Sequence, residues 1–258
     1  MTHHIPKETE GEIRIEVIDR AEDVVAGFDC MCNAFGHQTR DTLWIDLNPG
    51  WDKPGPEGRA RGAQLLVDSW RNITRDINGN DNTIFLKATL PNQQGERVVA
   101  GIAIWMQLSM VEGRGVKPSD DLRESKDLDV FYPNNEPEQR YLCQVYRSFV
   151  KRRIEVVKEK ESSQQPSLMH LRSCAVDPAY QRRGIALRLV QWGLDEAKRR
   201  GGLEAITEAS SMGRHVYQRL GFYGEGPDME YLVDSEFESR DRPPNLFMRT
   251  GPTKSKDI

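Results

Sequence analysis

This chain of 258 residues has few cysteines, no long hydrophobic run and no large excess of charge of either sign. Its four cysteines, at positions 30, 32, 143 and 174, lack the paired spacing of a zinc site, and we interpret them as reduced thiols of a cytoplasmic protein. A formal net charge of -4 provides no basic field for nucleic acid. No apolar run is long enough to cross a bilayer, and the first residues do not resemble a secretory signal. We therefore expect neither a nucleic-acid partner nor a membrane.

The length fits one elaborated domain with a sizeable core, as a monomer or homodimer. We expect residues 1–11 to be disordered and residues 12–234 to form a single domain. From residue 235 to 258 the sequence is charged and contains prolines, which predicts a loose tail.

Hydrophobic periodicity predicts a mixed α/β (α+β) sheet flanked by helices. A hairpin followed by strand–helix–strand–helix requires at least one parallel crossover in a mostly antiparallel sheet. The elements that we expect are strands at Glu12–Val17, Ile84–Leu90, Arg97–Gln107, Ser167–Val176 and Glu204–Ala209, helices from Asp23 and over Arg59–Ile77, Glu138–Lys160, Gly184–Arg200 and Ser211–Leu220, a loop over Trp44–Pro56, and one or two strands within Phe222–Val233.

The segment from Val176 to Ala186 predicts a turn that binds phosphate. Pro178 ends the strand, and the start of the next helix leaves backbone N–H groups without acceptors. Gly184 lets the backbone approach a ligand closely, while Arg182 and Arg183 add positive charge. Such a helix start suits a pyrophosphate.

The hexapeptide Gln181-Arg182-Arg183-Gly184-Ile185-Ala186 resembles the Q/R-x-x-G-x-G/A motif of the GCN5-related N-acetyltransferases, the GNAT superfamily. The strand, the V-x-P stop and the amphipathic helix around it resemble that family too, and the similarity extends over Leu168–Gly224. It implies the GNAT fold, in which Leu168–Val176 and Glu204–Ala209 form a parallel pair that splays apart to hold acetyl-CoA.

The resemblance also implies roles for single residues. The turn from Gln181 to Ala186 would hold the pyrophosphate of acetyl-CoA. The segment Cys174-Ala175-Val176 would offer its backbone to the pantetheine arm, with the Cys174 amide facing the thioester oxygen. A nucleophilic role for the Cys174 thiol is an alternative, although a cysteine in a strand is more often a small buried hydrophobe.

Ser211–Phe222 resembles the helix of this family that carries Y-x-x-x-G-F, with Tyr217 as its tyrosine. The Tyr217 hydroxyl could protonate the CoA thiolate as it leaves, or it could simply pack in the core. Ser210 stands where the family often has an asparagine that contacts the cofactor, so that contact stays open.

The attacking amine must lose a proton, and two residues are candidates for the base. His170 alternates along the strand with Cys174, which predicts that the two share a face. Glu208 lies near the end of the next strand, beside the expected splay. Structural roles for both residues remain alternatives, as does a chain of water molecules.

Residues 111–165 form an insertion that is longer than the family core needs. Within it, Phe131 and Tyr132 beside Asp127 and Asp129 could form an apolar wall whose carboxylates attract a cationic amine. The basic outer face predicted for the following helix includes Arg153. A solvated insertion that only packs on the sheet is the alternative.

The sequence thus predicts an enzyme that transfers acetyl from acetyl-CoA directly to a primary amine, without a metal and in a ternary complex. We expect the acceptor to be a small or medium-sized amine. The alternatives are a protein acetyltransferase, acting on lysine or an N-terminal amine, and a non-catalytic module that binds acyl-CoA. A Rossmann nucleotide-binding domain is excluded because no G-x-G-x-x-G follows the first strand.

Overall fold

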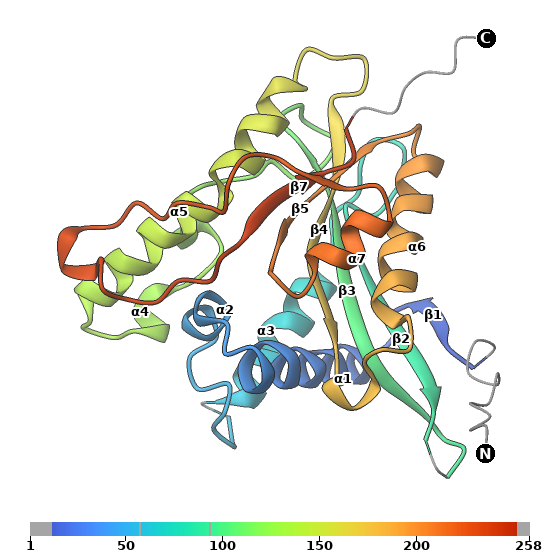
Figure 1. Cartoon of the computed structure of the whole chain (residues 1–258), viewed down its shortest axis with the longest axis horizontal. Helices are drawn as coiled ribbons and strands as arrows, with labels where there is room; N and C mark the ends of the chain where they lie inside the picture. The colour runs from blue at the N-terminus through green and yellow to red at the C-terminus, as the bar shows by residue number, and fades with distance from the viewer. Residues whose placement is uncertain (1–11, 57, 93, 252–258) are drawn as a thin grey trace, which may run out of the picture.

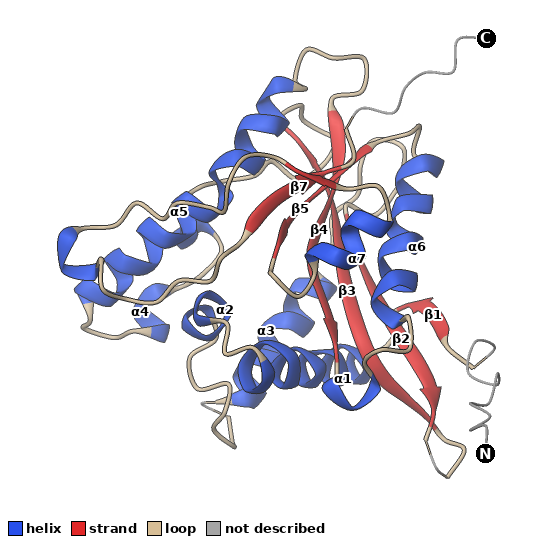
Figure 2. Cartoon of the chain, in the orientation of Figure 1, coloured by secondary structure: helices blue, strands red, loops and turns tan. Residues whose placement is uncertain are grey.

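A seven-stranded mixed sheet forms the centre of the protein, in a computed structural model that describes residues 12–56, 58–92 and 94–251 (Figures 1 and 2). The strand order is β1-β2-β3-β4-β5-β7-β6. Every pairing is antiparallel except that of β4 with β5. The prediction of a mixed, mostly antiparallel sheet with one parallel pair is confirmed. The expected disorder of residues 1–11 lies outside the described residues.

The elements follow one another along the chain in this order: β1 (Arg14–Val17), α1 (Ala21–Met31), the π-helix η1 (Cys32–Gln38), α2 (Thr42–Leu47), α3 (Arg59–Arg71), β2 (Thr83–Pro91), β3 (Arg97–Ser109), η2 (Leu122–Glu124), α4 (Leu128–Phe131), α5 (Glu136–Glu159), β4 (Ser167–Val176), η3 (Pro178–Tyr180), α6 (Ile185–Arg199), β5 (Glu204–Ala209), α7 (Arg214–Arg219), β6 (Tyr223–Gly224), η4 (Ser235–Phe237) and β7 (Leu246–Arg249). The bounds of β4 and β5 are those predicted from the sequence.

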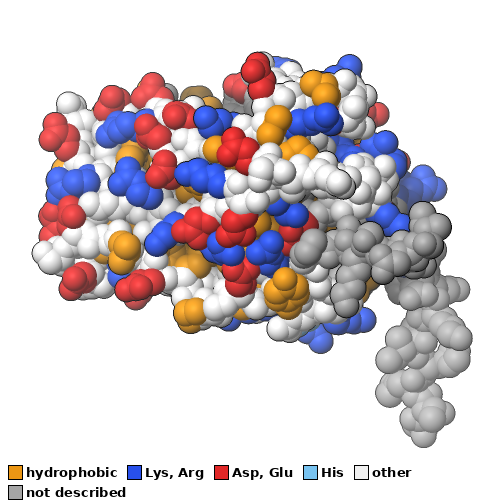
Figure 3. Space-filling model, turned by 90° about the horizontal axis from the view of Figure 1, so that it is seen from above, with side chains coloured by type: hydrophobic (Ala, Val, Ile, Leu, Met, Phe, Trp, Pro, Cys, Tyr) orange, Lys and Arg blue, Asp and Glu red, His pale blue; other side chains and the backbone are white. Residues whose placement is uncertain are grey.

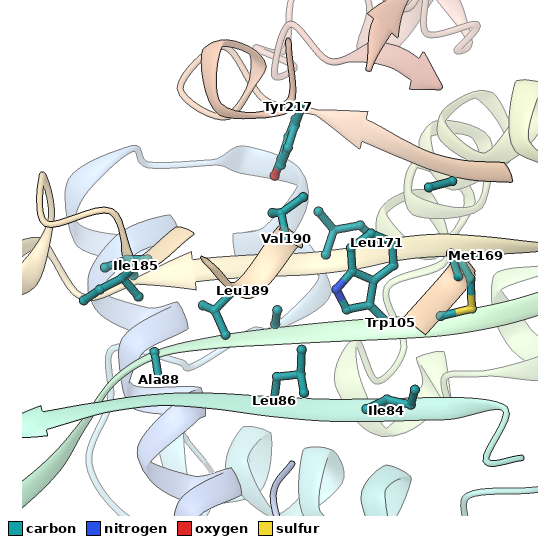
Figure 4. Packing of buried hydrophobic residues seen from close by; sticks show 14 of the residues in the cluster. Ile84, Leu86, Ala88, Trp105, Met169, Leu171, Ile185, Leu189, Val190 and Tyr217 are labelled. Atoms are coloured by element: carbon teal, nitrogen blue, oxygen red, sulfur yellow. The ribbon is translucent and has the colours of Figure 1, made fainter. Parts of the chain in front are cut away.

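Two layers of helices cover the two faces of the sheet, because alternate side chains of the central strands point to opposite sides. On one face, α6 and α7 enclose Trp105, Met169 and Leu171 (Figure 4). Gly193 of α6 allows this close packing, since a Cβ there would lie 1.9 Å from Cε2 of Trp105. On the other face, α1 and α3 cover one end of the sheet and α5 the other.

The parallel strands β4 and β5 stay paired only over their first residues. Leu168, Met169 and His170 pair with Glu204, Ala205 and Ile206, and the ladder then stops. The rest of β4 continues to Val176 along β3, while β5 continues to Ala209 along β7. The two strands therefore separate toward their carboxyl ends, as the sequence predicted.

Residues 235–251 are not the loose tail that the sequence predicts. After η4 the chain returns to the sheet as β7, between β5 and β6. Phe247 and Met248 are buried there, 3% and 0% exposed. These two apolar side chains and the ladder with β5 outweigh the charged, proline-bearing sequence around them.

One smaller prediction is also wrong in part, and another is confirmed by a single short strand. The segment expected to be a loop from Trp44 begins inside α2, whose start is capped by Asp41 accepting a bond from the Trp44 amide. Within Phe222–Val233, only Tyr223–Gly224 is a strand. Polar contacts instead hold the segment that follows, since the Leu232 amide donates to Ser148 and the Asp234 amide to Gln144 on α5.

Ion pairs join α5 to this returning segment. Arg140 contacts Asp234 and Glu236, and Arg240 contacts Glu138. On the face seen from above, basic side chains are interspersed with acidic ones, as Figure 3 shows. The segment 228–244 is therefore fixed along α5 mainly by paired charges and by Phe237, which packs against Tyr141.

Candidate functional site

The turn between β4 and α6 has the backbone conformation of an anion site. Gly184, the residue before α6, has a left-handed φ of 79°, and a Cβ at this position would meet no atom within 4 Å. Arg182 also has a positive φ, 66°. Left-handed residues in such a turn direct successive N–H groups into a common space.

The N–H groups of this turn are not used by the protein itself. Within the described part of the chain, the backbone N–H groups of residues 182–187 have no hydrogen-bond acceptor. The Arg188 amide is the first to bond, to the Gly184 carbonyl. Arg182, Arg183 and Gly184 are exposed, whereas Ile185 is buried and anchors the helix start. An anion can therefore reach a positive helix end whose donors are unpaired.

Gln181 holds the turn in place. Its side-chain amide donates to the Val176 carbonyl at 3.0 Å and exchanges two hydrogen bonds with Gln38 of η1. Asn33, also in η1, donates to the Asp177 carboxylate at 2.6 Å. Because both its hydrogen-bonding atoms are occupied, Gln181 positions the turn, and the N–H groups beyond it remain for a ligand.

Tyr217 lies on α7 and packs in the cluster that α6, β4 and β5 share. Its ring lies 5.8 Å from that of Phe222, and its hydroxyl points toward Val190 of α6 (Figure 4). Burial raises the pKa of this hydroxyl above its usual value, and the neighbouring Cys174 thiol raises it further. Tyr217 is therefore a neutral O–H donor at physiological pH.

The predicted cofactor strand places Cys174, Ala175 and Val176 on two faces. Cys174 and Val176 pack on the α6 side, and Ala175 packs with Ile102 on the α1 side. The surrounding protein desolvates the Cys174 thiol and raises its pKa to about 12, which argues against a nucleophilic thiolate. Ser210 follows β5, and its carbonyl accepts from the amides of Gly213 and Arg214.

His170 and Glu208 lie together beside the end of the parallel ladder. Nε2 of His170 is 2.8 Å from Oε2 of Glu208, and these side chains are 1% and 2% exposed. Arg153 of α5 donates two hydrogen bonds to the same carboxylate, at 2.8 and 2.7 Å. Nδ1 of His170 is buried and has no partner among the described residues.

The charges of this group are fixed by their contacts. Burial lowers the pKa of His170 to about 4, and the Arg153 charge also lowers it, against the opposing effect of Glu208. Burial alone would raise the pKa of Glu208, but Arg153 and then His170 lower it to about 2. At neutral pH, His170 is therefore uncharged, and Glu208 is a carboxylate bonded to a guanidinium.

A β-bulge overturns the prediction that His170 and Cys174 share a face. Ile104 of β3 pairs with Ser173 and the next residue, Trp105, pairs with Leu171, so Arg172 is an extra residue on β4. An extra residue shifts the alternation of side chains by one position. His170 consequently faces Glu208 and α5, while Cys174 faces α6 on the opposite side.

The insertion attaches to α2 rather than presenting a free acidic wall. Lys126 donates to the Leu47 carbonyl at 2.6 Å, and the Tyr132 hydroxyl donates to the Asp46 carbonyl at 2.7 Å. The Phe131 ring lies 4.8 Å from the Lys126 ammonium and also contacts Arg61.

The two acidic residues proposed for that wall have structural roles. The Asp127 carboxylate caps α4 by accepting from the amides of Asp129 and Val130. Asp129 in turn accepts from the side chain of Gln139 at 2.9 Å. The charged groups that contact the Phe131 ring are the cations Lys126 and Arg61.

Sequence reasoning missed the contribution of Arg153. The predicted outer, solvated face of α5 included this residue, yet its side chain is only 13% exposed and is paired with Glu208. Spacing alone gave no signal, because Arg153 lies beside other basic residues on the helix. A buried glutamate near the end of β5 requires a cationic partner, and this requirement could have predicted that a basic residue of another element turns inward.

Comparisons with known proteins agree with this arrangement. The sequence model of the acetyltransferase (GNAT) family matches residues 121–222. Arylalkylamine N-acetyltransferase 2 from Aedes aegypti is similar in structure, with 17% identity, a TM-score of 0.53 and coverage of 92% of this chain and 97% of that chain. The polyamine N-acetyltransferase of Drosophila melanogaster, which forms N-acetylagmatine, has 14% identity, a TM-score of 0.56 and the same coverage, 92% and 97%.

A third similar structure is a histone acetyltransferase HPA2 and related acetyltransferase from Corynebacterium glutamicum. It has 17% identity and a TM-score of 0.50, over 95% of this chain and 99% of that chain. A search of curated protein sequences gave no match. Across the described residues, no helix combines the length and the apolar character needed to span a membrane. Residues 121–222 of this chain thus match the acetyltransferase (GNAT) family, and the chain as a whole shares the fold of these solved acetyltransferases.

Proposed function

We propose that the protein transfers an acetyl group from acetyl-CoA to a primary amine by direct attack in a ternary complex. The observation that carries the proposal is the left-handed turn at Gly184. Its unpaired N–H groups lie at the start of α6, in the turn that follows β4, the strand that separates from β5. An anion site at the open end of two separating strands suits a ligand with a pyrophosphate and a long thin arm.

We assign the cofactor to the following parts of the chain. The backbone of the turn and the charges of Arg182 and Arg183 would bind the pyrophosphate. Residues 174–176 of β4 would accompany the pantetheine arm, where β5 no longer pairs. Ser210, at the end of β5, has no hydrogen bond from its hydroxyl within the described residues and is free to contact the arm.

In the reaction, a C–N bond forms between the amine and the acetyl carbon, and the C–S bond of the thioester breaks. One proton leaves the nitrogen and one is added to the sulfur. Tyr217 is the residue we assign to the sulfur, since its hydroxyl is neutral and points into the space between α7 and α6. Such a donor stabilises the negative charge that develops on the leaving thiolate.

We do not assign the base to a single side chain. A base works best with a pKa near the operating pH, and those of His170 and Glu208 are about 4 and about 2. Glu208 also already accepts from Arg153 and His170. We infer that these two residues hold the junction of β4 and β5, and that water carries the proton from the amine.

The acceptor that we propose is a small or medium-sized amine. The similar insect structures are enzymes named for arylalkylamines and polyamines. In this chain the insertion is fixed on α2 through Lys126 and Tyr132, which limits access from that side.

The proposal is tested by measuring CoA release from acetyl-CoA with a panel of primary amines. At least one amine should accelerate release well above hydrolysis. Gly184→Glu should abolish acetyl-CoA binding in calorimetry and turnover with it, because a carboxylate would enter the phosphate space. Gly79→Glu is the matched control, since Gly79 also has a positive φ, 81°, and open space at its Cβ.

Two outcomes would contradict this function. If no amine stimulates CoA release although acetyl-CoA binds, the domain is a binding module. If Gly184→Glu binds acetyl-CoA as tightly as the Gly79→Glu control, the phosphate site lies elsewhere.

A further inference from the structure

Arg172 has an unusual position in β4. It is the extra residue of the bulge, so it has no partner residue on β3. In a strand whose other residues are buried or half-buried, Arg172 is exposed, although the surrounding protein desolvates its guanidinium and lowers its pKa. Bulges commonly direct a side chain out of the regular pattern and occur next to active sites.

The bulge lies where the proposed reaction would occur. The ladder between β4 and β5 ends at the pair of His170 and Ile206, only two residues before Arg172. Cys174 and Tyr217 lie on the α6 side, which the proposed function assigns to acetyl-CoA. The acceptor is then expected on the other face of the sheet, which α1 covers at one end and α5 at the other (Figure 2).

Positive charge predominates around Arg172 on that face. The positive charge of its guanidinium works to lower the pKa values of Tyr146, His170 and Lys126. Burial has the larger effect on each of these pKa values. Arg153 contributes a second guanidinium. Tyr146, half-buried on α5, lies in the field of both arginines.

The carboxylates nearby do not neutralise Arg172. Both oxygens of Glu208 are bonded to Arg153, and one also contacts His170. Glu124 is an exposed residue of η2, and its charge raises the pKa of Tyr146, on which burial has the larger effect. Among the described residues, no carboxylate lies within ion-pair distance of Arg172.

We propose that Arg172 binds a carboxylate of the acceptor, so that the preferred substrate is an amine that also carries a carboxylate, as an amino acid does. The inference rests on the proposed function and specifies its acceptor. A guanidinium binds a carboxylate through two parallel N–H donors, which fixes the orientation of the acceptor as well as its affinity. Glu208 is already paired with Arg153, so its carboxylate is not available to bind the second ammonium group of a diamine acceptor.

The test compares acceptors that differ only in the carboxylate: phenylalanine against phenethylamine, and lysine against cadaverine. The wild type should show the higher kcat/KM with the carboxylate-bearing member of a pair. Arg172→Gln should lower that value roughly 10- to 100-fold, as expected for loss of a charged hydrogen bond, and should change the value for the other member less than about two-fold. Arg14→Gln, at an exposed arginine of β1, is the control.

Failure of this inference is distinct from failure of the proposed function. A wild type that prefers phenethylamine and cadaverine would overturn the inference while confirming an amine acetyltransferase. Equal losses for both members of a pair would give Arg172 a structural role instead. If Arg172→Gln does not fold, Arg172→Lys replaces it, and an unchanged preference for the carboxylate in that variant contradicts bidentate binding.

Discussion

At the scale of single residues, Tyr217 offers the most direct test of mechanism. Tyr217→Phe keeps the ring against Phe222 and removes only the hydroxyl. Because that hydroxyl is assigned to the leaving thiolate, kcat should fall roughly ten- to a thousand-fold while the dissociation constant of acetyl-CoA changes little. Tyr223→Phe, at a half-exposed tyrosine of β6, serves as control. Unchanged turnover with chemistry rate-limiting would reduce Tyr217 to a packing residue.

Also at this scale, the buried pair of His170 and Glu208 makes stability depend on pH. The pKa of His170 is lowered from 6.5 to about 4, so the unfolded chain binds an extra proton between these values. The stability due to neutral His170 is present above about pH 6.5 and is lost as the pH falls to 4. Glu208, lowered from 4.5 to about 2, adds a loss that begins below about pH 5.

Urea unfolding at a series of pH values measures this effect. Between pH 7 and pH 4 the free energy of unfolding should fall by about 2–3 kcal/mol through His170 alone. His170→Gln should show a flatter dependence between pH 6.5 and 5, where few carboxylates titrate. A variant with the slope of the wild type would show that His170 is not buried as a neutral ring.

At the scale of elements, β4 shows what the sequence can and cannot predict. Its bounds and its parallel neighbour follow from the strand pattern of Ser167–Val176 and the crossover helix after it. The bulge at Arg172 does not, because it depends on how β3 pairs with β4. A shift of one residue decides whether His170 faces the α6 side or α5, so the predicted face was wrong.

The pairing of Arg153 with Glu208 could not be predicted, for a similar reason. The helical periodicity of α5 is clear in the sequence, and the predicted helix closely matches Glu136–Glu159. Which of its basic residues turns inward depends on where the helix lies over β5, a relation between distant segments. The turn before α6 could be predicted because its glycine, proline and helix start are local in the chain.

At the scale of the whole molecule, the C-terminal return completes the sheet. Without β7, the far side of β5 would be an unpaired edge, and Ile206 would lose contact with Phe247. Glu204, whose side chain is 0% exposed, would lose one of its two cations, Arg249, and keep Lys160. Removing a partner from a buried charge typically costs about 3–5 kcal/mol.

Deletion of residues 243–258 should therefore leave little folded protein, because the exposed edge of β5 also promotes aggregation. The matched control is deletion of residues 252–258, which leaves β7 intact and should give a cooperative thermal transition like that of the full chain. Soluble yield and the midpoint of thermal unfolding measure both variants. If the longer deletion unfolds at the same temperature as the shorter one, β7 does not hold β5, and the loose tail expected from the sequence is the better description.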